Sequence, residues 1–146
     1  MNNDLLTYNA DLLKKQLRWL QHSYTQAREI GIKDHYDISE LDIYENLSSR
    51  FARTVDFLIR KVFRSIDDAE FEPQGTLIDV VNNAHKRNLF DNIEDIRAIK
   101  DLRNAIAHEY IDEELEKLFE DLLNYSSIVI KISESTINYI KTQSSF

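Results

Sequence analysis

The chain has 146 residues and a formal net charge of −8, with 42% hydrophobic and 30% charged residues. Two glycines and one proline are too few for the many turns of a β-sandwich or β-barrel. The absence of cysteine excludes disulfides, thiolate metal sites and cysteine nucleophiles, and the negative charge disfavours broad binding to nucleic-acid phosphates.

Apolar residues recur every three or four positions along most of the chain, which is the period of an amphipathic helix. The first stripe extends to Ala27, and Gly31 is placed to end that helix. A second helix is predicted to open at Ser39, whose hydroxyl can cap it, and its apolar stripe continues to Ile66.

The second half of the chain alternates between loops and further stripes. Residues 67–75 contain the only proline and several carboxylates, and are predicted to form a solvated loop. Shorter apolar stripes follow at 77–84 and 93–106, with a turn at 89–92 between them. The last stripe, over 112–140, is long and predicts a terminal helix.

Three long and two shorter stripes joined by short links predict an all-α fold, an antiparallel bundle of about five helices. The length fits a single domain spanning residues 1–146. The start of the chain lacks the features of a signal peptide, and no apolar run is long enough for a membrane helix. We therefore expect a cytoplasmic protein.

The end of the fourth predicted helix carries the residues best suited to chemistry. On a helical wheel, Asn104 and His108 lie on the solvent-facing side, and Arg103 lies at the border of that face. Arginine offers two parallel donors to phosphate oxygens, and histidine transfers protons near neutral pH. Arg97 and Lys100 extend the face as candidate RNA contacts. The same residues also fit a surface helix end whose basic side chains stabilise the helix dipole.

The spacing of arginine and histidine alone does not choose a site. Arg28 and His35 also stand a few residues apart, although Gly31 between them predicts a helix end. The more specific pattern is Arg103-Asn104-x-x-x-His108-x-Tyr110.

That pattern resembles the signature of the HEPN superfamily, and the tyrosine at its end resembles the form of the signature in the HepT branch. The motif covers eight residues, and the all-α architecture expected of the family covers nearly the whole chain. The resemblance implies a dimeric HEPN-like bundle acting as a metal-independent endoribonuclease, the toxin of a toxin–antitoxin pair. It implies that Arg103 stabilises the phosphate transition state, His108 transfers a proton and Asn104 orients one of them. These groups would act in a cleft shared by two subunits, without a metal or cofactor.

The resemblance also implies a partner and a form of regulation. Tyr110 would accept AMP from an MNT-like nucleotidyltransferase antitoxin, which would place bulk and negative charge beside Arg103. The alternative is a non-catalytic helical partner or substrate-binding subunit of a nucleotidyltransferase. The net negative charge and the acidic start of the last helix favour that alternative. A structural adaptor that needs no intact motif is a third hypothesis.

The second predicted helix carries a basic stripe with one aromatic residue. Its members are Arg50, Arg53, Arg60 and Arg64, with Lys61 at the margin and Phe57 inside the stripe. Interleaved cations and an aromatic ring can hold single-stranded RNA. The same stripe is also typical of a solvated face or of an interface with a second subunit or an antitoxin.

Overall fold

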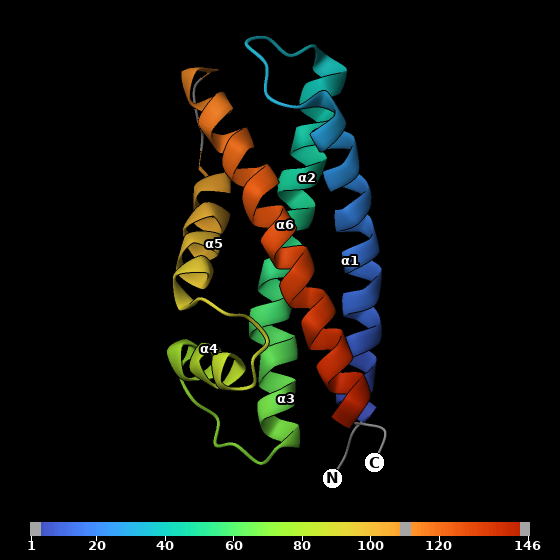
Figure 1. Ribbon diagram of the computed structural model, residues 1–146, viewed down its shortest axis with the longest axis vertical. Coiled ribbons are helices and arrows are strands. Elements are labelled where there is room, and N and C mark those ends of the chain that lie inside the picture. The colour runs from blue at the N-terminus through green and yellow to red at the C-terminus, as the bar shows by residue number, and fades with distance from the viewer. Residues whose placement is uncertain (1–3, 109–111, 144–146) are drawn as a thin grey trace.

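The computed structural model describes residues 4–108 and 112–143, and this part of the chain is helical without any strand (Figure 1). The elements in chain order are α1 (Asp4–Ile30), α2 (Ile38–Phe57), the π-helical turn η1 (Leu58–Val62), α3 (Phe63–Ala69), α4 (Leu77–Lys86), α5 (Ile93–Ile106) and α6 (Asp112–Gln143). Because η1 joins α2 to α3 without a break, the described residues form five helical rods. The predicted all-α bundle of about five helices is therefore confirmed.

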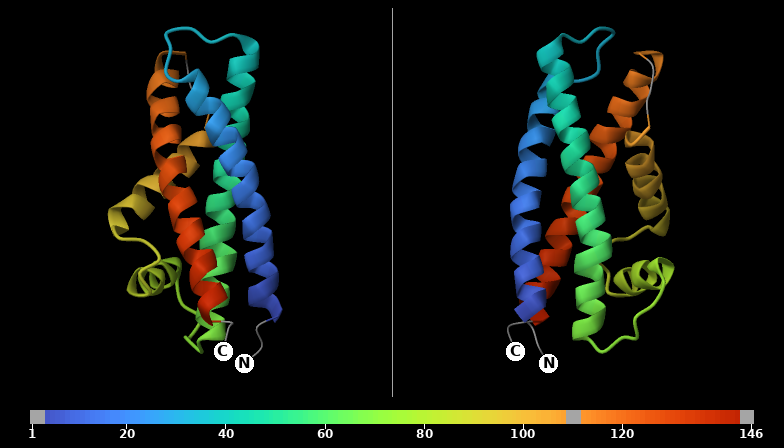
Figure 2. Two further views of the ribbon diagram at one scale, coloured as in Figure 1. Left: turned by 45° about the vertical axis from the view of Figure 1, so that its right-hand side comes forward. Right: turned by 180° about the vertical axis from the view of Figure 1, so that it is seen from behind.

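Three long rods form the body of the bundle. They are α1, the continuous α2–η1–α3 rod and α6, and they run side by side along the long axis (Figures 1 and 2). α1 begins and α6 ends at the same end of the bundle. α5 packs beside α2 and α6, whereas α4 lies crosswise over α3 and η1 (Figure 1). None of the described helices is both long and apolar enough to cross a membrane.

The core is built from the stripes that the periodicity predicts. On α1 the buried apolar residues are Leu6, Ala10, Leu13, Leu17, Leu20 and Ala27. On α2 they include Leu47, Phe51 and Val55, none more than 3% exposed. Near the end of the bundle that holds the α1–α2 connection, Tyr44 stacks on Phe119 of α6 with 3.9 Å between ring centroids. Burial of these faces holds the three long rods together.

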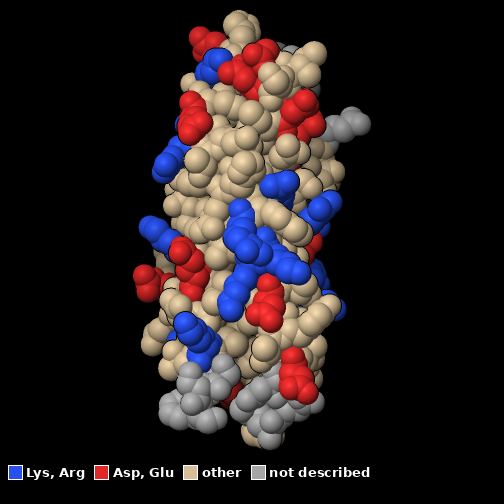
Figure 3. Space-filling view, turned by 90° about the vertical axis from the view of Figure 1, so that its right-hand side faces the viewer, with Lys and Arg blue, Asp and Glu red and all other residues tan. Residues whose placement is uncertain are grey.

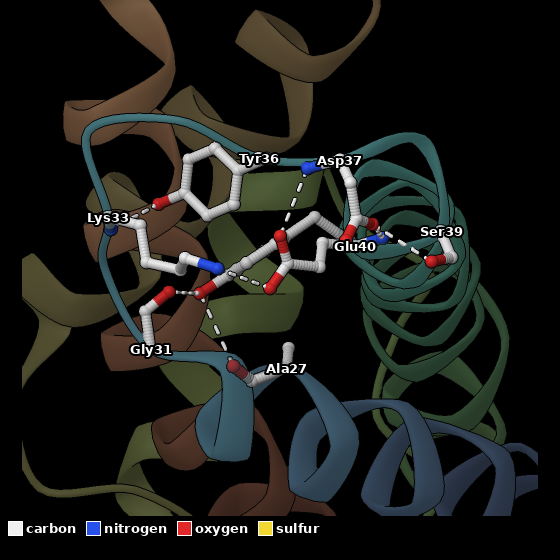
Figure 4. Close-up of polar contacts among 8 residues, drawn as sticks. Ala27, Gly31, Lys33, Tyr36, Asp37, Ser39 and Glu40 are labelled. Carbon is white, nitrogen blue, oxygen red and sulfur yellow. Dashed lines mark hydrogen bonds and ion pairs between the residues drawn. The ribbon is translucent and has the colours of Figure 1, made fainter.

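The connection between α1 and α2 shows one prediction confirmed and one wrong. α1 ends at Ile30, and Gly31 follows with a φ of +73°, a conformation that glycine adopts without a Cβ penalty. The N-cap of α2, however, is Asp37 and not Ser39. The Asp37 carboxylate accepts from the Glu40 N–H at 2.9 Å, and Glu40 accepts from the Asp37 N–H at 3.0 Å (Figure 4). This capping box satisfies two amides, whereas the Ser39 hydroxyl instead donates to Asp37.

Hydrogen bonds and an ion pair fix this connection to the bundle. The phenol of Tyr44 donates to the Gly31 carbonyl at 2.7 Å, and burial raises the pKa of that phenol. Lys33 donates its backbone N–H to the Tyr36 oxygen and pairs with Glu40 at 2.6 Å (Figure 4). The segment is thus ordered by local contacts that also close the end of the bundle.

The middle rod contains a π-turn at η1. The Phe63 N–H donates to the Leu58 carbonyl, a bond that spans five residues instead of four. The extra residue lets both members of two adjacent pairs, Leu58–Ile59 and Val62–Phe63, lie in the core. A wheel drawn at 100° per residue therefore misplaces side chains of this rod beyond Phe57.

The predicted loop at 67–75 begins later than expected, because α3 runs past Asp67. Asp67 is 2% exposed, and its carboxylate accepts from Arg87 Nη1 at 2.6 Å. Arg87 also donates through Nε to Glu70 at 3.0 Å, and the Tyr139 phenol of α6 donates to the same carboxylate. The prediction of a solvated acidic loop is therefore wrong for Asp67. Its carboxylate can be buried because Arg87, 20 residues later in the sequence, compensates its charge.

Candidate functional site

The motif occupies the end of α5. Asn92 caps the start of this helix by accepting from the Glu94 N–H at 2.9 Å, and the helix buries Ile96, Ile99 and Leu102 against the bundle. This anchoring leaves Arg103 and Asn104 in the last turn, beside α2. His108 follows the helix end, and Tyr110 lies outside the described residues.

Arg103 is fixed by a carboxylate on the neighbouring rod. Its Nε and Nη2 donate to Oδ1 and Oδ2 of Asp56, each at 2.9 Å. The two side chains are 33% and 39% exposed, so the pair lies at the edge of solvent. These hydrogen bonds and the carboxylate charge raise the pKa of the guanidinium above its already high ordinary value. Two parallel bonds hold the plane of the guanidinium, and Nη1 makes no hydrogen bond within the described part of the chain.

A pocket of about 350 Å³ opens beside this pair, between α2, η1, α4 and α5. Its polar lining comprises Asp56, Arg60, Lys100, Arg103 and Asn104. Its apolar lining comprises Val55, Ile59 and Leu77. We call it the arginine pocket. The structure thus brings together Lys100, Arg103 and Asn104 of α5. It adds two polar residues of the middle rod, Asp56 and Arg60.

Arg97 does not line the arginine pocket. It is exposed and pairs with Glu94 on the same helix, with Nη1 and Oε1 3.4 Å apart. Such a pair at the surface leaves the cation accessible but contributes little stability.

His108 lines a different pocket, of about 710 Å³, between α5 and α6. Three carboxylates, Asp101, Glu114 and Asp121, and one cation, Lys117, share this lining with His108. We call it the histidine pocket. The wheel predicts Asn104 and His108 on one face, but a single chain does not bring both into one pocket. The reason is that α5 ends at Ile106, so that helical spacing no longer applies at position 108.

The alternative pair, Arg28 and His35, lacks a comparable arrangement. The Arg28 guanidinium lies 5.5 Å from the centre of the Tyr24 ring on its own helix. His35 is exposed in the connection after Gly31. No carboxylate among the described residues holds the Arg28 guanidinium in a fixed plane, whereas Asp56 does this for Arg103.

The basic residues that the sequence predicts in one stripe of the second helix lie in three different environments. Arg50 donates to the Trp19 carbonyl of α1 at 3.1 Å, and Arg64 donates to the Gly75 carbonyl before α4 at 3.1 Å. Arg60 lines the arginine pocket, and Phe57 is partly buried against the core. The π-turn and these contacts break the continuous stripe that the wheel predicts.

A second group of cations lies on α1. Lys14, Lys15 and Arg18 surround a shallow depression together with Asp11. Figure 3 shows basic side chains gathered at the middle of this face, with acidic side chains above, beside and below them. The exposed rings of Tyr8 and Trp19, 61% and 54% exposed, belong to the same helix. This face is well removed in sequence from the motif and supplies no residue to either pocket.

Sequence reasoning missed Asp56. It is 47 residues from Arg103, and nothing in its local pattern distinguishes it from other acidic residues.

In the described part of the chain, no group of three or more histidine and carboxylate side chains is placed to hold a metal ion. Comparison of the chain with known protein families, curated proteins and solved structures finds no match.

Proposed function

We propose that the chain is a metal-independent endoribonuclease toxin of a toxin–antitoxin system, resembling HepT within the HEPN superfamily. The motif from Arg103 to Tyr110 supports the proposal at the level of sequence. The observation that carries it is the Asp56–Arg103 pair, because an arginine with a fixed plane and a free Nη1 is suited to phosphate.

The chemistry requires three functions at one phosphodiester. The ribose 2′-oxygen loses its proton and attacks the adjacent phosphorus, the bond to the 5′-oxygen breaks, and that oxygen gains a proton. The products are a 2′,3′-cyclic phosphate and a free 5′-hydroxyl. In the proposal Arg103 offsets the negative charge of the transition state, and Asn104 orients one of the reacting groups. His108 accepts the proton that the 2′-oxygen loses and delivers a proton to the 5′-oxygen as it leaves.

A homodimer supplies what one chain lacks. One chain has one motif histidine, which lines a different pocket from Arg103. The arginine pocket carries three cations and one carboxylate, whereas the histidine pocket carries three carboxylates and one cation beside His108. Two copies related by a two-fold axis can place Arg103 of one subunit across a shared cleft from His108 of the other. Arg103 of one subunit would then act with His108 of the other.

We further propose that Tyr110 is the regulatory residue, which accepts AMP from an MNT-like nucleotidyltransferase antitoxin. The resemblance implies that the added phosphate would lie beside Arg103, where it would compete with RNA for the guanidinium. Co-expression with such a partner would increase the mass of the chain by whole adenylyl groups.

The direct test is RNA cleavage by unmodified protein in the presence of a chelator. His108→Ala is expected to lower the rate at least about 100-fold, a typical contribution of proton transfer. The matched control is His22→Ala, which removes an exposed imidazole from α1. Mixing Arg103→Ala with His108→Ala subunits should restore part of the activity, because a mixed dimer retains one arginine and one histidine from opposite chains. Cleavage by His108→Ala at the parental rate would contradict the proposal, and a mixture no more active than its components would contradict the shared site.

The second candidate function is a non-catalytic partner or substrate-binding subunit of a nucleotidyltransferase. The carboxylates of the histidine pocket favour it, because Asp101, Glu114 and Asp121 repel phosphate. Under this alternative the purified chain binds the transferase without cleaving RNA. The absence of cyclic-phosphate ends at all protein concentrations would favour it over the nuclease.

A further inference from the structure

The arginine pocket holds more positive charge than the motif accounts for. Three cations, Arg60, Lys100 and Arg103, face one carboxylate, Asp56, which is already shared with Arg103. Neither Arg60 nor Lys100 forms an ion pair with a described residue. A chain with a net charge of −8 thus concentrates two uncompensated cations beside the proposed reaction site.

The π-turn of the middle rod places Arg60 in the lining of the arginine pocket. Arg60 lies within the π-turn, one helical turn beyond Asp56. The turn carries Ile59 into the core and leaves Arg60 exposed at the rim of the pocket. π-turns are less stable than regular helix and occur frequently at functional sites. Lys100 reaches the same rim from α5, so the two cations come from separate rods.

Part of the pocket lining is apolar. Val55, Ile59 and Leu77 make up this apolar part of the lining, and the pocket volume of about 350 Å³ falls within the range of small-molecule sites, roughly 300–1,000 Å³. A free phosphate ion would leave this apolar part in water. A nucleotide places its phosphate against cations and its ribose or base against apolar side chains, so both parts of the lining are used.

We infer that the arginine pocket is a nucleotide subsite for single-stranded RNA, in which Arg60 and Lys100 bind the phosphate next to the scissile one. The inference rests on the proposed function, because it assigns Arg103 to the scissile phosphate. Arg60 and Lys100 are binding residues and take no part in proton transfer.

The test is binding of a fluorescent 2′-O-methyl oligoribonucleotide, which lacks the attacking hydroxyl and is not cleaved by this route. Arg60→Gln and Lys100→Gln are each expected to weaken binding at least fivefold. Each should also reduce the slope of log K against log salt by about 0.7, the value for one phosphate contact on a single strand. The matched control is Arg53→Gln, which removes an exposed cation of the same rod outside the pocket and should change the affinity less than twofold.

Three outcomes would overturn the inference. The first is binding by both pocket variants within twofold of the parent, and the second is an equal loss in Arg53→Gln. The third is displacement of the oligonucleotide by inorganic phosphate as effectively as by unlabelled RNA, which would show an anion site without a nucleotide component. Failure of the nuclease proposal is distinguishable: the oligonucleotide would bind through Arg60 and Lys100, but unmodified RNA would remain intact.

Discussion

The role of Asp56 gives the sharpest test of the site. Asp56→Asn keeps the size of the side chain but removes the charge and one of the two acceptors used by Arg103. Because both side chains are about one-third exposed, solvent screens the pair. Exposed ion pairs contribute roughly 0.2–1 kcal/mol, and bidentate geometry places this one near 1 kcal/mol. The free energy of unfolding should therefore fall by no more than about 1 kcal/mol.

Under the proposed nuclease function, the expected effect on RNA cleavage is much larger. Without its carboxylate clamp the Arg103 guanidinium samples other orientations, and misplacement of a catalytic group by about 1 Å can cost on the order of 100-fold in rate. Single-turnover cleavage and urea unfolding of the same preparation separate the two effects. Asp42→Asn, an exposed change on the same helix, is the control. Unchanged or faster cleavage by Asp56→Asn would refute the positioning role, and faster cleavage would show that Asp56 competes with RNA for Arg103.

Two further predictions concern the network that joins α3, α4 and α6. Arg87→Met leaves the buried Asp67 without its cation, and loss of one partner of a buried pair costs roughly 3–5 kcal/mol of unfolding free energy. A decrease of less than about 1 kcal/mol, measured by urea unfolding, would contradict this. Burial and the hydrogen bond to Glu70 raise the pKa of the Tyr139 phenol to about 12, whereas an unfolded tyrosine titrates near 10. The folded state therefore holds this proton more tightly, so the network's contribution to stability is lost as the pH rises from 10 to 12. Tyr139→Phe should lose less stability over that range than the parent, measured by unfolding at pH 9 and pH 11, and equal losses would rule out the phenol as the cause.

The periodicity of apolar residues predicts the helices of this chain well. Each long stripe has a single buried face, and two glycines in 146 residues leave few places where the chain can turn. Gly31 ends α1 as expected, because its φ of +73° suits a residue without a Cβ. The prediction of Ser39 as the cap of α2 is a local error: Asp37 can also cap a helix, and its reciprocal bond with Glu40 makes it the cap here.

The pattern of apolar residues does not predict which side chains meet between rods. A stripe gives the direction of a face on its own helix but not the residue that it meets on another. Asp56 and Arg103 are 47 positions apart, and Asp67 and Arg87 are 20 positions apart. The π-turn adds a further obstacle, because one extra residue in the turn changes the angular position of all later residues of the rod.

The end of α5 explains why the residues of the motif do not line one pocket within a single chain. The N–H groups of Ala107 and His108 donate to carbonyls three residues earlier, at 3.2 and 3.1 Å, as is common where a helix tightens at its C-terminus. Had the helix continued, Asn104 and His108 would lie one turn apart on the same face. The tightened turn instead directs position 108 into a lining shared with α6, while Arg103 stays clamped against α2. The motif therefore contains two groups that one chain holds in separate pockets, and the proposed nuclease would need a second copy to bring them to one phosphate.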